Sequence, residues 1–145
     1  MKARIRAATK TDIGPMAELT TQLGYPVDPE TLRERLAGVR TRTTDEVLVA
    51  VDDDDRPIAW VHVSLLALLE TSDLAAINGL VVDERRRSGG IGASLVEAAE
   101  QWARDRGATA ILVRSRSTRV LAHRFYERLG YLEVKRSHVF EKPLV

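Results

Sequence analysis

One segment of the chain decides how the rest is interpreted: Arg85-Arg86-Arg87-Ser88-Gly89-Gly90-Ile91-Gly92. It follows an apolar run from Ile77 to Val82 and opens a strongly patterned helical stretch. The first amides of a helix have no acceptor within the helix, and the helix dipole adds partial positive charge there. Glycine lets an anion approach these amides because it carries no Cβ. The segment therefore predicts a strand, an anion-binding turn and a helix, with a phosphorylated ligand.

Two familiar phosphate-binding motifs fit this turn poorly. A P-loop ends in Gly-Lys followed by Ser or Thr, and no lysine follows any of these glycines. A dinucleotide fingerprint would use Gly90 and Gly92 but meets Leu95 where its third glycine belongs. The acidic residue expected about twenty positions further on is also missing, because that region reads Leu112-Val113-Arg114. The remaining pattern, Arg87-x-x-Gly90-x-Gly92, suits a pyrophosphate with an extra positive charge beside it.

This pattern and a second motif together resemble the GNAT superfamily of acyl-CoA-dependent N-acyltransferases. The second motif is Ala122-His123-Arg124-Phe125-Tyr126-Glu127-Arg128-Leu129-Gly130-Tyr131, about thirty residues downstream of the glycines. The resemblance spans nearly the whole chain and includes the opening strand Ile5–Ala8, Thr11-Asp12, and the strand that ends in Leu80-Val81-Val82. It implies transfer of an acetyl group from acetyl-CoA to a primary amine, by direct attack in a ternary complex without a covalent acyl-enzyme.

Apolar periodicity and turn residues predict one α/β domain over residues 1–145, in the order β-α-α-β-β-β-α-β-α-β-β. The resemblance makes the central sheet mixed and mostly antiparallel, with about seven strands. It also implies a β-bulge near Asn78–Val82 that splays the strand at 74–82 from the strand at 109–114. The expected strands are 2–8, 46–51, 58–66, 74–82, 109–114, 131–134 and 137–141, and the expected helices are 12–24, 28–39, 90–106 and 118–129.

Composition limits the class of protein. A chain of 145 residues with 44% hydrophobic and 30% charged residues is typical of one soluble globular domain. The net charge of +1 gives no general attraction to nucleic acid or to a membrane. There is no cysteine, so disulfides and thiolate chemistry are excluded, and three scattered histidines lack the spacing of metal ligands. With no recognisable signal peptide or apolar membrane span, we expect a cytoplasmic protein that uses no metal.

The resemblance assigns roles to two groups of residues. Tyr126 would protonate the departing CoA thiolate, since a phenol can donate a proton without being ionised beforehand. A free backbone N–H at about Val82 would polarise the thioester carbonyl. Successive amides of 87–93 would hold the pyrophosphate, while Arg85 and Arg86 would face solvent or the 3′-phosphate. The residues expected to bind the cofactor are Leu80, Val81, Val82, Arg87, Ser88, Gly89, Gly90, Ile91, Gly92, Ala93, Arg119 and Tyr126.

Arg119 is a departure from the family pattern, which often has asparagine there. The arginine could contact cofactor phosphate or pantetheine, or point away. The amine nucleophile arrives protonated, so a base or a water chain must accept its proton. The candidates are Glu70, His62, Asp73 and His123. Glu70 is favoured because it follows a strand near the expected acceptor side, whereas a histidine inside an apolar strand such as His62 is more often structural.

The acceptor itself is not legible from the sequence. A small polyamine, an aminoglycoside-like molecule, an amino acid and a peptide amine all remain open, with contacts expected from 23–39 and 66–73. A homodimer formed through the last strands is a further expectation. The competing function is a regulatory module that binds acyl-CoA without turnover. Such a module would keep the glycine turn and lose the proton donor, so the presence of Tyr126 favours the enzyme.

Overall fold

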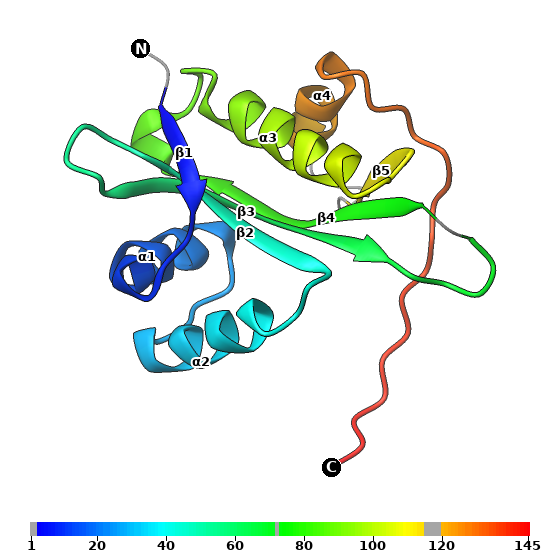
Figure 1. Ribbon diagram of the computed structural model, residues 1–145, viewed down its shortest axis with the longest axis horizontal. Helices are drawn as coiled ribbons and strands as arrows, with labels where there is room; N and C mark the ends of the chain where they lie inside the picture. Colours follow the sequence, from blue (N-terminus) through cyan, green and yellow to red (C-terminus); the bar gives the residue numbers. More distant parts are fainter. Residues whose placement is uncertain (1–2, 72, 115–119) are drawn as a thin grey trace. The chain divides into compact units, whose positions relative to one another are not determined.

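The computed structural model describes residues 3–71, 73–114 and 120–145 (Figure 1). The chain forms two compact units, Met1–Arg114 and Ser115–Val145. The first unit contains the sheet and three α-helices, and the second contains one α-helix. None of the described helices combines the length and apolar character needed to cross a bilayer. A single domain over residues 1–145 stays a prediction.

The first unit alternates strands and helices much as the apolar pattern predicts. Its elements are β1 (Arg4–Ala7), η1 (Lys10–Asp12), α1 (Ile13–Leu23), α2 (Pro29–Arg40), β2 (Asp45–Val51), β3 (Pro57–Leu66), β4 (Leu74–Val82), η2 (Glu84–Arg86), α3 (Ile91–Asp105) and β5 (Ala110–Val113). The strands follow one another in a single five-stranded sheet. The pairs from β1 to β4 are antiparallel, and β4 and β5 are parallel. The sheet is therefore mixed and mostly antiparallel, as expected.

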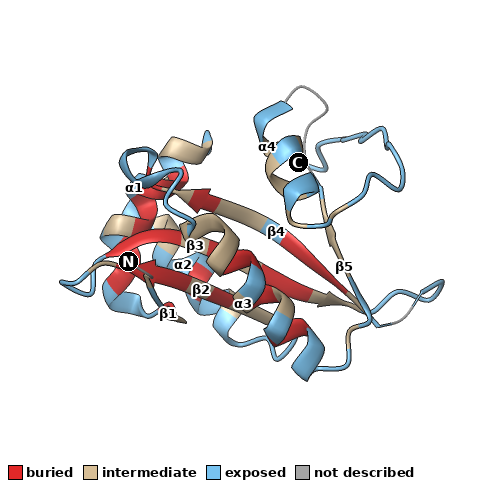
Figure 2. Cartoon of the chain, turned by 90° about the horizontal axis from the view of Figure 1, so that it is seen from above, coloured by how far each residue is buried: buried red, intermediate tan, exposed pale blue. Residues whose placement is uncertain are grey.

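Helices cover both faces of this sheet. Figure 1 shows α1 and α2 on one face and α3 on the other. The residues packed between the sheet and the first two helices are Ala8, Ile13, Met16, Leu36, Val47, Val49 and Val51, with Leu32, Val39 and Trp60 against them. On the opposite face, α3 buries Leu95, Val96, Ala99, Trp102 and Ala103. Figure 2 shows that the buried residues concentrate in the central strands and on the inner sides of these helices.

Local sequence signals explain where α1 and α2 begin and end. The Asp28 side chain accepts a hydrogen bond of 2.9 Å from the backbone N–H of Thr31, and Pro29 occupies the first helical position. Gly24 ends α1 in the left-handed conformation, with φ of 107°. The expected helix at 12–24 also suggests Asp12 as an N-cap, but its side chain makes no capping hydrogen bond to α1.

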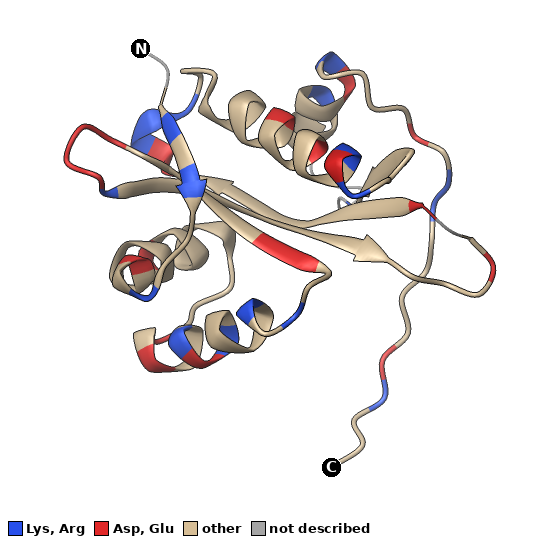
Figure 3. Cartoon of the chain, viewed as in Figure 1, with Lys and Arg blue, Asp and Glu red and all other residues tan. Residues whose placement is uncertain are grey.

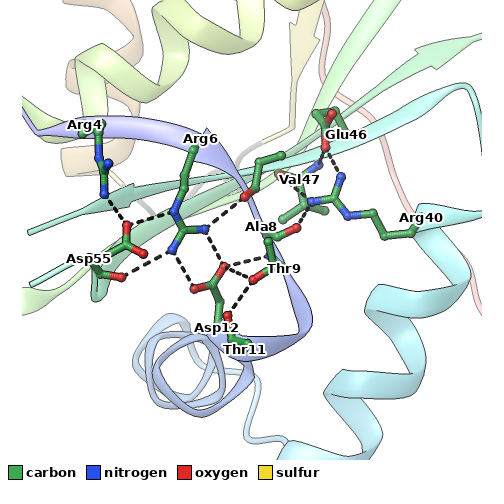
Figure 4. A network of polar contacts seen from close by, with 11 residues as sticks. Arg4, Arg6, Ala8, Thr9, Thr11, Asp12, Arg40, Glu46, Val47 and Asp55 are labelled. Atoms are coloured by element: carbon green, nitrogen blue, oxygen red, sulfur yellow. Dashed lines mark hydrogen bonds and ion pairs between the residues drawn. The ribbon is translucent and has the colours of Figure 1, made fainter.

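Asp12 instead forms part of a polar network at the start of the sheet (Figure 4). Its carboxylate accepts hydrogen bonds from the Arg6 guanidinium at 2.8 and 2.9 Å and from the Thr9 backbone N–H at 2.8 Å. Burial raises the pKa of Asp12, but the hydrogen bonds and charge of Arg6, together with Thr9, outweigh it and leave the pKa below its ordinary value. Arg6 also bonds to Asp55 of the β2–β3 turn, at 3.1 Å. The network therefore ties β1, η1 and this turn together.

A β-bulge interrupts β4 at Asn78. On β3, His62 lies opposite Gly79 and the next residue, Val63, lies opposite Ile77, so Asn78 is the extra residue. The parallel pairing of β4 with β5 runs from Leu74 to Ile77 and stops there. A bulge in the expected region is therefore confirmed, and β4 has no described strand on its β5 side beyond Ile77. Gly79 is needed after the bulge, because a Cβ there would come within 2.9 Å of the Trp60 ring.

The second unit contains α4 (Val120–Arg128), and the expected residues 118 and 119 lie outside the described part of the chain. Gly130 ends this segment with φ of 93°, and the N–H of Tyr131 bonds to the carbonyl of Tyr126 at 3.0 Å. The Tyr126 ring lies edge to face with Phe125, 5.0 Å between centroids, and with Tyr131, 5.6 Å. The three rings form one aromatic cluster.

The predicted strands at 131–134 and 137–141 are wrong, and with them the element order after α4 and the count of about seven strands. Residues 131–145 contain no strand, so the sheet has five in the described residues. Alternation predicts which side chains share a face, but a strand also needs a neighbour for its backbone hydrogen bonds. The Glu133–Arg136 ion pair of 2.5 Å also indicates a bend, because residues three apart in a strand point to opposite faces.

Candidate functional site

The glycine turn joins η2 to α3 through two left-handed residues. Ser88 has φ of 72°, and Gly90, which precedes the helix, has φ of 80°. The first hydrogen bond of α3 runs from the N–H of Ser94 to the carbonyl of Gly90, at 3.0 Å. The amides of 91–93 precede that bond and have no acceptor inside the helix. The turn therefore presents consecutive N–H donors with the conformation of an anion-binding nest.

The three arginines of the turn differ in how they are held. Arg85 donates to Asp83 at 3.0 and 3.3 Å, and Arg86 lies 3.9 Å from Asp52 of the β2–β3 turn. Arg87 donates from Nε to the neutral carbonyl of Val82 at 3.3 Å. No ion pair involving Arg87 is found in the part of the chain that the structure describes. Figure 3 shows the acidic β2–β3 turn and the basic η2 at the same end of the first unit. Arg87 is therefore the arginine whose charge remains available to a ligand.

The edge of β4 beyond the bulge carries further N–H donors. The N–H of Asp83 bonds to the carbonyl of Ile58 on β3, at 2.8 Å. Because successive amides of a strand point to alternate sides, the amides of Val82 and Leu80 point to the opposite edge, away from β3. Pairing with β5 has already ended at Ile77. The predicted Val82 amide thus lies on an edge without a described strand partner, while that of Val81 points towards β3. The role of the Val82 amide in polarising the thioester carbonyl stays a prediction.

The candidate bases lie in different places. Glu70 is exposed in the loop between β3 and β4, before Leu74, whereas Val82 ends β4. The strand from Leu74 to Val82 spans about 26 Å at about 3.3 Å per residue, so this placement gives Glu70 no support for a thioester held at Val82. Asp73 lies at the same far end, where its carbonyl accepts the N–H of Thr109 at 2.7 Å.

The remaining predicted residues lie either in the second unit or outside the described part of the chain. Tyr126 and His123 lie on α4 of the second unit, and Arg119 lies outside the described residues. Within the first unit, the structure brings the glycine turn and Arg87 together with the end of β4 through the Arg87–Val82 hydrogen bond.

Sequence reasoning missed Asp45, the partner of His62. The Asp45 carboxylate lies 2.8 Å from Nε2 of His62, and it also accepts a hydrogen bond of 2.7 Å from the Thr44 hydroxyl. Burial raises the pKa of Asp45. The hydrogen bonds from His62 and Thr44 and the charge of Arg42 lower it by more, so the pKa lies below its ordinary value. The two residues come from different strands, so only the β2–β3 register could have revealed the pair.

An open hollow of about 450 Å³ lies near the other end of β4. It falls within the region expected to contact the acceptor, and its lining residues are Leu65, Leu66, Ala67, Leu68, Leu69, Thr71, Asp73, Leu74, Arg106 and Ala108. Among the residues that the structure describes, no group of three or more His, Asp or Glu side chains is arranged to hold a metal ion.

Comparison with known proteins places the chain in a well-populated family. Residues 15–131 match the sequence model of the Acetyltransferase (GNAT) family. Two relatives are named aminoglycoside N(6')-acetyltransferase type 1. The one from Klebsiella aerogenes is 32% identical over 68% of this chain and 66% of its own length. The one from Stenotrophomonas maltophilia is 28% identical over 97% of this chain and 93% of its own length.

A solved structure shares the fold over nearly its whole length. A mutant of the BH1408 protein from Bacillus halodurans matches with a TM-score of 0.81 and 28% identity. The match covers 98% of this chain and 99% of that protein.

Proposed function

The chain belongs to the acetyltransferase (GNAT) family, and on this basis we propose that it moves an acetyl group from acetyl-CoA to a primary amine. The attack would be direct, in a ternary complex, without an acyl-enzyme. The acceptor we propose is a small molecule with several amino groups, of the aminoglycoside class, because both relatives carry that substrate in their names. Acetylation of a peptide amine or an amino acid in place of an aminoglycoside would overturn this choice of acceptor.

The observation that carries the proposal is the glycine turn within the family match. The match spans both the turn and the Phe125-Tyr126 motif, and the amides of 91–93 have no acceptor inside α3. Such unbonded donors at a helix start suit the diphosphate of coenzyme A. The free edge of β4 would bind the pantetheine arm through backbone hydrogen bonds, and Arg87 would add positive charge. The donor set therefore fits acetyl-CoA.

Each chemical role then falls to one group of this chain. The Val82 amide would stabilise the negative charge that develops on the thioester oxygen. Tyr126 would donate a proton to the departing thiolate, and Arg119 would contact the cofactor. The alternative function is an acyl-CoA-binding module without turnover, which would have no use for the Tyr126 hydroxyl.

Thiol release from acetyl-CoA, measured across a panel of aminoglycosides, polyamines, amino acids and peptides, separates these functions. We expect release that depends on an amine, and a loss of about 100-fold in kcat for Tyr126→Phe with unchanged affinity for acetyl-CoA. Binding of acetyl-CoA without release on any amine would favour the module. Equal rates for Tyr126→Phe and the unaltered chain would remove the tyrosine from the mechanism.

A further inference from the structure

A polar cluster lies beside the bulge of β4 and outside the proposed acetyl-CoA site: Asp45, His62, Ser64 and Asn78. Building on the proposed function, we propose that His62 accepts the proton of the acceptor amine, with Asp45 orienting its ring. Ser64 and Asn78 would complete the amine-binding subsite.

The strand registers and two contacts place the four side chains on one face of the sheet. His62 and Ser64 are two apart on β3 and so share a face. Asp45 pairs with Ser64 across β2 and β3, and its carboxylate lies 2.8 Å from His62 Nε2. Asn78 donates from its amide to the Ser64 hydroxyl at 2.8 Å. The cluster therefore crosses three neighbouring strands in the middle of the sheet.

The imidazole is held in the orientation that a base requires. Only 8% of the Asp45 side chain is exposed, and its lowered pKa keeps the carboxylate ionised, so it accepts the hydrogen bond from Nε2–H. That assignment leaves the lone pair on Nδ1. No hydrogen bond at Nδ1 is found among the described residues, and 25% of the His62 side chain is exposed. A base oriented by a carboxylate is the arrangement that proton abstraction needs.

The charged groups around His62 favour the same role. Asp45 is the ionised group that contacts the ring, and Arg42 lies 3.8 Å from that carboxylate. Glu46, the next residue on β2, is turned to Arg40. On β4 the residue opposite His62 is Gly79, and the residue before it is Asn78; neither titrates.

The cluster also lies next to the free edge of β4. His62 is opposite Gly79, and facing residues of antiparallel strands lie about 5 Å apart between Cα atoms. Gly79 precedes Leu80, whose amide points to the free edge proposed for acetyl-CoA. Asn78 is exposed although it lies within a central strand. An amine that enters beside Asn78 would thus pass His62 on its way to the thioester. The thioester is proposed at Val82, three residues or about 10 Å further along β4 than Gly79, so the proton of the amine would reach Nδ1 through water.

The proposed step balances as follows. The protonated amine first passes one proton, through water, to Nδ1 of His62, and this frees the lone pair with which its nitrogen forms a bond to the acetyl carbon. The carbon–sulfur bond then breaks, and the thiolate takes a proton from Tyr126. The acylated nitrogen loses its second proton to water, the Tyr126 phenolate regains a proton from water, and His62 returns its proton to water, so the products are the amide, coenzyme A and one proton.

The test compares His62→Gln and Asp45→Asn with two control variants, His138→Gln and Asp54→Asn. These controls make the same chemical changes at exposed positions of the C-terminal segment and the β2–β3 turn. Acetyl-CoA affinity, kcat and the pH profile of kcat/KM are measured for each with one aminoglycoside. We expect His62→Gln to lose about 100-fold in kcat and Asp45→Asn about tenfold. Both should bind acetyl-CoA as tightly as the unaltered chain.

The pH profile separates catalysis from a structural role. If His62 is the base, His62→Gln should abolish the fall of kcat/KM at low pH that reports protonation of the enzyme. A fall that reports protonation of the amine should instead move to another pH when a different acceptor is used. Turnover and an acid limb that survive His62→Gln would overturn this inference alone. Acetyl-CoA binding without turnover of any amine by the unaltered chain would overturn the proposed function, and the inference with it.

Discussion

Arginine occupies two contrasting settings in the first unit. Near the start of the sheet, Arg6 donates to both oxygens of Asp12, to Asp55 and to the carbonyl of Ala7, at 2.8–3.1 Å. At the glycine turn, Arg87 makes one bond of 3.3 Å to the Val82 carbonyl. A guanidinium offers five N–H donors, so Arg6 is committed to the fold while Arg87 keeps most of its donors. The number of donors in use, rather than charge itself, distinguishes a structural arginine from one available to a ligand.

The largest expected effect comes from blocking the glycine turn, where Arg87 is available to a ligand. Gly90→Glu introduces a carboxylate and a strained positive φ where the diphosphate should bind, so acetyl-CoA affinity should fall by more than about 100-fold. Calorimetric titration measures the affinity, and circular dichroism checks that the fold persists. Gly38→Glu is the control, because Gly38 is exposed within α2 and a Cβ at this position would have no neighbouring atom within 4 Å. Unchanged affinity in Gly90→Glu would place the diphosphate elsewhere.

The structural role of Arg6 is tested by the substitution Arg6→Ala. This change leaves the Asp12 carboxylate, with 3% of its side chain exposed, without its guanidinium partner. The free energy of unfolding should fall by about 3 kcal/mol, as found for one-sided loss of a buried ion pair. Denaturation in urea measures it. Arg4→Ala, which removes an exposed partner of Asp55, should cost less than about 0.5 kcal/mol. Equal losses for the two variants would contradict the assigned role of Arg6.

The smallest effect, and the sharpest test of the contrast, is expected for Arg87→Ala. The free energy of unfolding should change by less than about 0.5 kcal/mol, because Arg87 is exposed. Its acetyl-CoA affinity should nevertheless fall by about tenfold, the loss of one charge-assisted contact. Arg85→Ala is the matched control, since Arg85 is already paired with Asp83. An equal loss of affinity in both variants would indicate a general effect of charge at the turn.

Periodicity predicted the elements up to β5 because each depends on local patterns and caps, such as Asp28 before α2 and Gly24 after α1. The bulge in β4 came from the family resemblance, since Asn78 in an otherwise apolar run carries no sign of an extra residue. The strands expected at 131–141 failed because alternation says nothing about a pairing partner. The Asp45–His62 pair was missed for a related reason, because it depends on how two strands align.

The bulge at Asn78 has a consequence for how this chain can vary. If Asn78 were deleted, the ladder between β3 and β4 would become continuous, and residues 74–77 would keep their β3 partners and their faces, because Val63 already lies opposite Ile77. A deletion within residues 74–77 would instead turn the residues before it to the other face of the sheet, and Ala75, Ala76 and Ile77 are all buried, so the helices would have to repack. The fold should therefore tolerate single-residue deletions at Asn78 and in the β2–β3 turn, whereas deletions within residues 74–77 should be eliminated.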